Sequence, residues 1–134
     1  MKIRVGLRTS LAQSFLDDIS KGTAGSPKIE IYEGAMPANI GDAITGALLA
    51  EFPLVNTVGT VSAGVLTFDA IASDSSANNS GTAGFARVLD RDADEILYLT
   101  TSITGGGGDL QLSTVILTAG EPVTITSGVI RAGL

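Results

Sequence analysis

The chain has 134 residues, a net charge of −6, and neither histidine nor cysteine. These absences exclude the usual acid–base catalyst of a triad, thiolate nucleophiles, disulfides and zinc sites with thiolate ligands. The negative charge disfavours nucleic acid as a partner. The longest charge-free stretch, 52–68, is interrupted by Pro53 and by two glycines, so no membrane-spanning helix is expected. We therefore predict a protein that binds or assembles, with no enzymatic activity and no cofactor or metal.

Composition predicts a single domain rich in short strands. The apolar residues make up 44% of the chain, which is enough for a hydrophobic core at this length. Aromatic residues make up only 4%, so that core must consist mainly of Val, Ile, Leu and Ala. Seventeen glycines, together with many Ser, Thr and Asn residues, indicate frequent turns.

The N-terminal segment differs from the rest of the chain in charge. Residues 1–28 carry five basic and two acidic side chains, a net charge of +3, whereas residues 29–134 carry three basic and twelve acidic ones, a net charge of −9. Residues Lys2–Arg8 alternate apolar and basic side chains, a pattern typical of a half-exposed strand or an extended arm. Such an arm could steer docking onto an acidic protein surface, or it could simply be solvated.

A helix is predicted directly after this arm, over residues 11–20. Ser10 and Gln13 have the spacing of a capping box, in which both side chains satisfy backbone N–H groups at a helix start. Gly22 is a suitable residue to follow the last turn. Apolar side chains recur every four residues and form one stripe: Leu11, Phe15 and Ile19.

The remainder of the chain predicts seven or eight short strands. They cover residues 28–33, 48–54, 65–69, 82–89, 95–100, 110–117 and 122–130. No helices alternate with them, so the predicted fold class is mainly β: an antiparallel β-sandwich, jelly-roll-like, with one N-terminal helix. We expect residues 1–27 to form the arm and helix and residues 28–134 the sandwich, packed as one compact unit.

Three groups of residues could in principle carry chemistry. Asp90, Asp92 and Asp94 have the spacing of the first ligands of a calcium loop, but the later ligand positions do not match, which favours a hairpin turn. The run Gly105–Gly108 lacks the lysine of a phosphate-binding loop and is interpreted as an inter-strand loop. The carboxylates that could form a hydrolytic pair are scattered and lack aromatic platforms for a sugar: Glu51, Asp69 and Asp74.

Arg87 is the basic residue with the most informative position. Alternation places it on the same strand face as Phe85 and Leu89. A half-buried arginine is normally satisfied by an acid or a carbonyl within the fold, and we favour this structural role over contact with a partner.

Several segments, in this order, resemble a recurring pattern in short β-rich virion structural proteins of tailed bacteriophages and prophages, of the capsid cement or decoration type. The segments are residues 28–34, 36–38, 43–50, 64–67, 75–77, 81–90, 108–112 and 118–127. The resemblance implies a jelly-roll-like protein on the outer capsid shell. It further implies a dimer or trimer that binds the major capsid protein, with no catalytic residues.

On this hypothesis the N-terminal segment is the contact arm. The candidate partner contacts are Ile3, Arg4, Val5, Arg8, Leu11 and Phe15. Two alternatives stay open. A tail or head–tail joining protein would have the same composition but few copies in the particle. A host-surface or carbohydrate-binding module would need an accessible loop site, such as residues 73–80 or 105–109.

Overall fold

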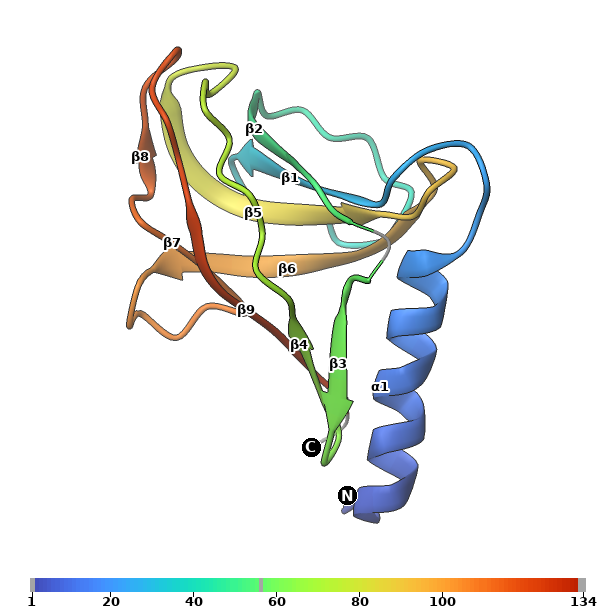
Figure 1. Ribbon diagram of the computed structural model, residues 1–134. Helices are drawn as coiled ribbons and strands as arrows, with labels where there is room; N and C mark the ends of the chain where they lie inside the picture. The colour runs from blue at the N-terminus through green and yellow to red at the C-terminus, as the bar shows by residue number, and fades with distance from the viewer. Residues whose placement is uncertain (1, 56, 133–134) are drawn as a thin grey trace.

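The structure is a computed structural model that describes residues 2–55 and 57–132. These residues form one helix and nine strands (Figure 1). The elements are α1 (Val5–Ser20), β1 (Lys28–Glu33), β2 (Leu48–Pro53), β3 (Gly59–Ser62), β4 (Val65–Phe68), β5 (Gly81–Leu89), β6 (Glu95–Ile103), β7 (Leu110–Leu112), β8 (Ile116–Leu117) and β9 (Ile125–Arg131).

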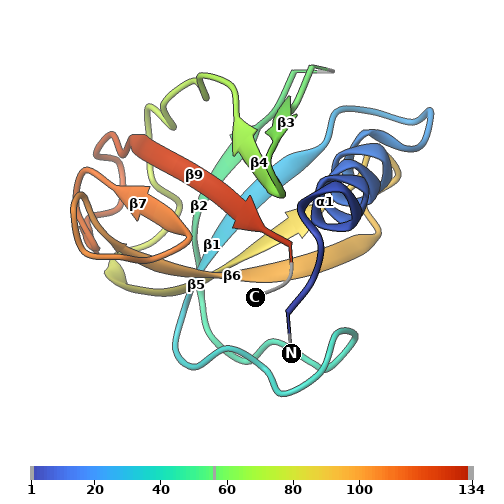
Figure 2. The ribbon, with the colours of Figure 1, turned by 90° about the horizontal axis from the view of Figure 1, so that it is seen from below.

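The strands form one strongly curled sheet, with the order β2-β1-β5-β6-β7-β9-β4-β3 and with β8 paired to β5. Figures 1 and 2 show how the sheet folds over, so that its β1–β5 part and its β4–β9 part lie on two sides of the molecule. The prediction of a mainly β, sandwich-like fold with one N-terminal helix is confirmed. The finer prediction of a jelly-roll arrangement is not confirmed by this strand order.

Aliphatic side chains fill the space between the two parts of the sheet, as the composition predicts. β1 and β5 place alternate side chains there, and α1 adds Ala12 and Ile19, both fully buried. The largest fully buried apolar side chains are Phe52, Phe85, Ile19, Ile29, Ile31, Leu49, Leu66, Leu110, Leu112, Val88 and Val123. Helix α1 packs on β3 and β4 and thereby belongs to the same core.

Two bulges beside the end of β1 increase the curl of the sheet. Tyr32 pairs with Phe85 while Glu33 pairs with Ala83, so β5 has one extra residue, Gly84, at this point. A similar register shift on the β2 side of β1 lies between Ile31 and Tyr32. An extra residue bends its strand and increases the local twist, which suits a sheet that has to fold over on itself.

Helix α1 is longer than predicted, because Val5–Arg8 is helical instead of extended. The reason is tertiary: Thr9 Oγ1 accepts a hydrogen bond from the backbone N–H of Gly64 in the β3–β4 turn, and the Arg8 side chain packs against the same glycine. Docking on this turn favours the helix over the strand that alternation alone predicts.

The predicted capping box is wrong. Ser10 lies inside the helix, where its hydroxyl donates to the carbonyl of Gly6, and the amide of Gln13 donates to Asp17. The N-cap residue is Arg4, whose side chain makes no capping hydrogen bond. The predicted end of the helix is correct, since Gly22 follows the C-cap residue, Lys21, with a φ of +110°.

The glycine run creates the only parallel strand pair in the described residues. Gly105 and Gly107 adopt positive φ angles, so the chain turns back and β7 runs parallel to the end of β6. A side chain at Gly108 would come within 2.8 Å of the backbone N of Ser102, so the loop also packs closely on β6. The single strand predicted over residues 110–117 is divided into β7 and β8, and β3 was not predicted.

Candidate functional site

The N-terminal half of α1 exposes large apolar side chains next to basic ones. Val5 and Leu7 are each 49% exposed, and Leu11 is 41% exposed. Lys2 and Arg4 directly precede the helix and are also exposed, and no acidic residue precedes Asp17 in the sequence. Leu7 and Leu11 are four residues apart and share one side of α1, whereas Val5 points to the other side. We call Leu7 and Leu11, together with the preceding Lys2 and Arg4, the docking face. An exposed group of apolar side chains with one sign of charge is typical of a protein–protein contact.

An apolar groove adjoins the docking face where α1 passes the end of β9. It has a volume of about 310 Å³ and is lined by Leu11, Ser14, Phe15, Asp18, Arg131 and Ala132. A second cavity, of about 210 Å³, shares Phe15 and Arg131 with the first and extends toward β6. Phe15 therefore separates two open spaces and does not fill either of them.

The six candidate contact residues fall into three groups. Arg4 and Val5 are exposed at the start of α1, whereas Leu11 and Phe15 line the groove. Ile3 is half-buried, and Arg8 is half-buried because its side chain packs against Gly64. The sequence pattern did not indicate Leu7. It also did not indicate the residues of β6 and β9 that line the second cavity, Leu97, Leu99 and Ile130, or Ala132, which lines the groove directly after β9.

In residues 2–55 and 57–132, no helix combines the length and the apolar character needed to cross a bilayer. No protein-family model, curated protein or solved structure matches this chain. Its function is therefore inferred from the residues themselves.

The acidic cluster at the β5–β6 connection forms a turn, as the mismatch to a calcium loop indicates. One carboxylate oxygen of Asp90 accepts hydrogen bonds from the backbone N–H groups of Asp92 and Asp94. Asp92 in turn accepts from the N–H groups of Thr23 and Ala24, and these hydrogen bonds lower the pKa of its carboxyl. Asp90 thus holds its own turn, and Asp92 holds the segment after α1. The two carboxylates bind backbone N–H groups and do not converge on a site for a metal ion.

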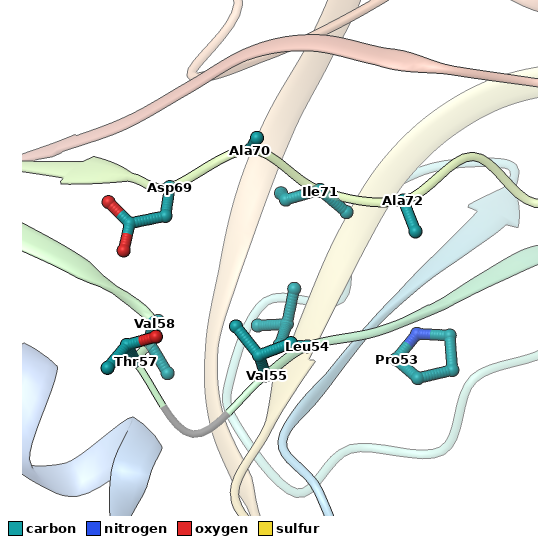
Figure 3. A pocket seen from close by; sticks show the side chains of 9 residues that line it. All are labelled: Pro53, Leu54, Val55, Thr57, Val58, Asp69, Ala70, Ile71 and Ala72. Atoms are coloured by element: carbon teal, nitrogen blue, oxygen red, sulfur yellow. The ribbon is translucent and has the colours of Figure 1, made fainter.

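The scattered carboxylates do not form a catalytic pair. Asp74 accepts hydrogen bonds from the backbone N–H groups of Glu51 and Ser76, so it connects its own loop to strand β2. Asp69 lies at one end of a small cavity of about 110 Å³, which is lined by residues 53–55, 57–58 and 69–72 (Figure 3). The remaining side chains that line this cavity are uncharged. Across the described residues, no group of three or more Asp, Glu, His or Cys side chains could hold a metal ion.

Arg87 belongs to a network of charged and aromatic side chains on one face of β1, β5 and β6. Its guanidinium donates to the Glu30 carboxylate at 2.5 and 2.9 Å and to the Tyr32 hydroxyl at 2.9 Å. The Tyr32 hydroxyl donates to the same Glu30 oxygen, and a carboxylate oxygen of Glu95 lies 3.6 Å from Arg87. The structural role predicted for Arg87 is confirmed.

This network sets the protonation states of its members. Burial of Glu30 disfavours its charge, but the hydrogen bonds and the charge of Arg87 outweigh burial and lower the pKa of the carboxyl. Burial, followed by the nearby charge of Glu30, raises the pKa of Tyr32 to about 12. Tyr32 also stacks on Phe85, with ring centroids 5.6 Å apart. The face is therefore a satisfied structural network and does not present a free charge to a ligand.

The raised pKa of Tyr32 predicts a loss of stability in strong alkali. As the pH rises above the usual pKa of 10, the unfolded tyrosine ionises while the folded one stays neutral until about pH 12. The free energy of unfolding is therefore expected to fall between pH 10 and 12. In a Tyr98→Phe variant, Tyr32 is the only tyrosine, and its phenolate absorbance is expected to titrate near pH 12. A midpoint near 10 would contradict the prediction.

Proposed function

We propose that this chain is a structural protein of a phage virion, a capsid cement or decoration protein that binds the major capsid protein on the outer shell and stabilises the assembled lattice. One observation carries the proposal: the docking face combines exposed apolar side chains of α1 with the exposed basic side chains that precede it. The order of sequence segments that resembles such proteins supports it independently.

Stabilisation by such a protein follows from linkage. A protein that binds only the assembled lattice lowers the free energy of that lattice relative to its free subunits. The apolar area of the docking face is small, so each contact is expected to be modest. Many copies acting on one shell make the total effect large. The basic side chains suit an acidic capsid surface and would increase the association rate.

The copy number of the chain in purified virions is the first test. Hundreds of copies, in a simple ratio to the major capsid protein in quantitative mass spectrometry, are expected for a cement protein. A few copies to a few dozen would instead favour the alternative of a tail or head–tail joining protein. Absence from the particle would contradict a virion role and favour a binding module.

A substitution on the docking face tests the contact itself. Replacing Leu7 by aspartate is expected to weaken binding to capsids that lack the chain at least tenfold, or about 1.4 kcal/mol, since it removes apolar contact and places a carboxylate in the interface. Ile116→Asp is the matched control, because Ile116 is 69% exposed on β8, away from α1. Equal capsid binding by both variants would show that the docking face is not the contact.

A further inference from the structure

One side of α1 carries residues that recur every three or four positions, the spacing by which two helices make contact. We call them the pairing face: Arg4, Leu7, Leu11, Phe15 and Asp18. Leu7 and Leu11 are each at least 41% exposed, although leucine gains most from burial. The side of α1 that bears the fully buried Ala12 and Ile19 is a different one, so the pairing face is not used by the core.

The C-terminal part of the pairing face borders open space. Leu11, Phe15 and Asp18 line the apolar groove of about 310 Å³, and Phe15 itself is only half-buried. Figure 1 shows α1 along one side of the molecule, beside β3. A second helix that lies against this side can therefore place an apolar side chain in the groove.

The pairing face is complementary to itself when two copies of α1 run antiparallel. If the two Leu11 side chains meet at a two-fold axis, positions equally far before and after Leu11 face each other. Leu7 then lies against Phe15, and Arg4 lies against Asp18, once on each side of the axis. Apolar side chains meet in the middle and opposite charges at both ends. A parallel pair would instead place like charges together.

The charges at the ends of α1 are the second observation that points to an antiparallel partner. The dipole of a helix favours acidic side chains in the first turn and basic ones in the last turn. All residues of α1 are described, and its first turn has no acidic residue and its last turn no basic one. Arg4 instead precedes the first turn, and Asp17 and Asp18 lie in the last.

An antiparallel partner compensates both ends. It brings its own Asp18 to the positive N-terminus of α1 and its own Arg4 to the negative C-terminus. Arg131 of β9 also lines the groove and partly offsets the charge of Asp18. The attraction for Arg4 therefore comes from the end of the helix as well as from Asp18.

We propose that two copies of this chain form a dimer through an antiparallel pair of α1 helices, in which Leu7 of each copy enters the groove beside Phe15 of the other. The inference does not depend on the proposed virion function. The pair covers Leu7 and Leu11, so a copy that binds the capsid protein through the docking face has to leave the dimer first. Dimer formation thus keeps the exposed leucines of the free protein out of water.

Sedimentation velocity of the purified chain tests the dimer without any capsid, and we expect a dimer at about 100 µM. Arg4→Glu and Asp18→Lys are each expected to raise the dimer dissociation constant at least tenfold, because each places like charges together at both ends of the pair. An equimolar mixture of the two variants is expected to restore the dimer, since opposite charges then face each other again.

Asp17→Lys is the matched control for charge, because Asp17 lies in the same turn but does not line the groove. A mixture of Arg4→Glu with Asp17→Lys is expected to stay largely monomeric. A native chain that is monomeric at about 100 µM overturns the proposal. A dimer that neither Arg4→Glu nor Asp18→Lys weakens also overturns it.

Engineered cysteines test the orientation of the two helices, since the chain has none of its own. Leu11→Cys is expected to form a disulfide with its own copy across the axis. Gln13→Cys is the control, because two residues further along lies about 200° around the helix. Mixed Arg4→Cys and Asp18→Cys variants are expected to form a heterologous disulfide. If each of these two variants forms a disulfide only with itself, the pair is parallel and the proposal is overturned.

Discussion

Replacing Arg87 by methionine is expected to lower the free energy of unfolding by about 3 kcal/mol, the lower end of the range for breaking a buried ion pair. Glu30 is only 4% exposed, and its carboxylate accepts two hydrogen bonds from Arg87. Lys28, whose Nζ lies 3.3 Å from a Glu30 carboxylate oxygen in the native chain, is retained in the variant, which limits the loss. Methionine keeps much of the apolar stem, so the change reports mainly on the charge.

Urea unfolding at pH 7 and at lower pH measures this effect and its cause. The Glu30 pKa is lowered in the folded state, so the ion pair stabilises fully above the usual pKa of 4.5 and is lost as the pH falls through the lowered value. The difference between the native chain and Arg87→Met is therefore expected to shrink in acid. Arg131→Met, on an exposed strand position without an ion pair in the described residues, is the control. A loss below about 1 kcal/mol at pH 7 would mean that the pair behaves as a surface salt bridge.

The central strands could be predicted because their alternation coincides with burial. Residues 28–33 form β1 with the predicted bounds, and β5 begins one residue before the predicted range. In both strands the sequence pattern and the tertiary contacts favour the same structure, which is the condition under which local patterns are reliable. The turns at Asp90–Asp94 and at Gly105–Gly108 were predicted for the same reason, since Asp and Gly are suited to the turns they form.

The wrong predictions of local structure have a common cause: contacts between residues that are distant in the sequence decide the local structure. Val5–Arg8 alternates like a strand but becomes helical by docking on the β3–β4 turn. That hairpin was itself only half predicted, because its turn residues, Ala63 and Gly64, both adopt positive φ. Alanine is uncommon in this conformation, so the sequence does not carry the Asn-Gly or Asp-Gly signal of such a turn.

Only the part of the candidate site that α1 contributes could be predicted from the sequence. The apolar stripe indicates Leu11 and Phe15, and the exposed basic residues indicate a contact. The other side, with the second cavity, depends on β7 being only three residues long, so that in the described residues no strand lies between the facing edges of β6 and β9 on the N-terminal side of Leu110. Neither the length of β7 nor its parallel pairing is encoded in a local pattern, so Leu97 and Ile130 carried no signal.

Replacing Gly84 by alanine is expected to destabilise the fold by at least about 3 kcal/mol, the upper end of the range for overpacking. Gly84 is the extra residue of the β5 bulge, and the backbone of Gly34 lies directly against its Cα. A Cβ atom at this position would overlap the Gly34 carbonyl, which belongs to the backbone and cannot rotate away. Either β5 or the turn after β1 must therefore move.

The bulge would be the first part of the sheet to change. Displacing β5 here also disturbs the stacking of Tyr32 on Phe85, so near-ultraviolet circular dichroism is expected to change together with the unfolding midpoint. Gly6→Ala is the control, because nothing lies within 4 Å of its added Cβ and alanine favours the helix by up to roughly 1 kcal/mol. That variant is expected to be slightly more stable than the native chain. A Gly84→Ala protein with native stability would show that the sheet can move apart at the bulge, and that its curl does not depend on the close approach of β5 to Gly34.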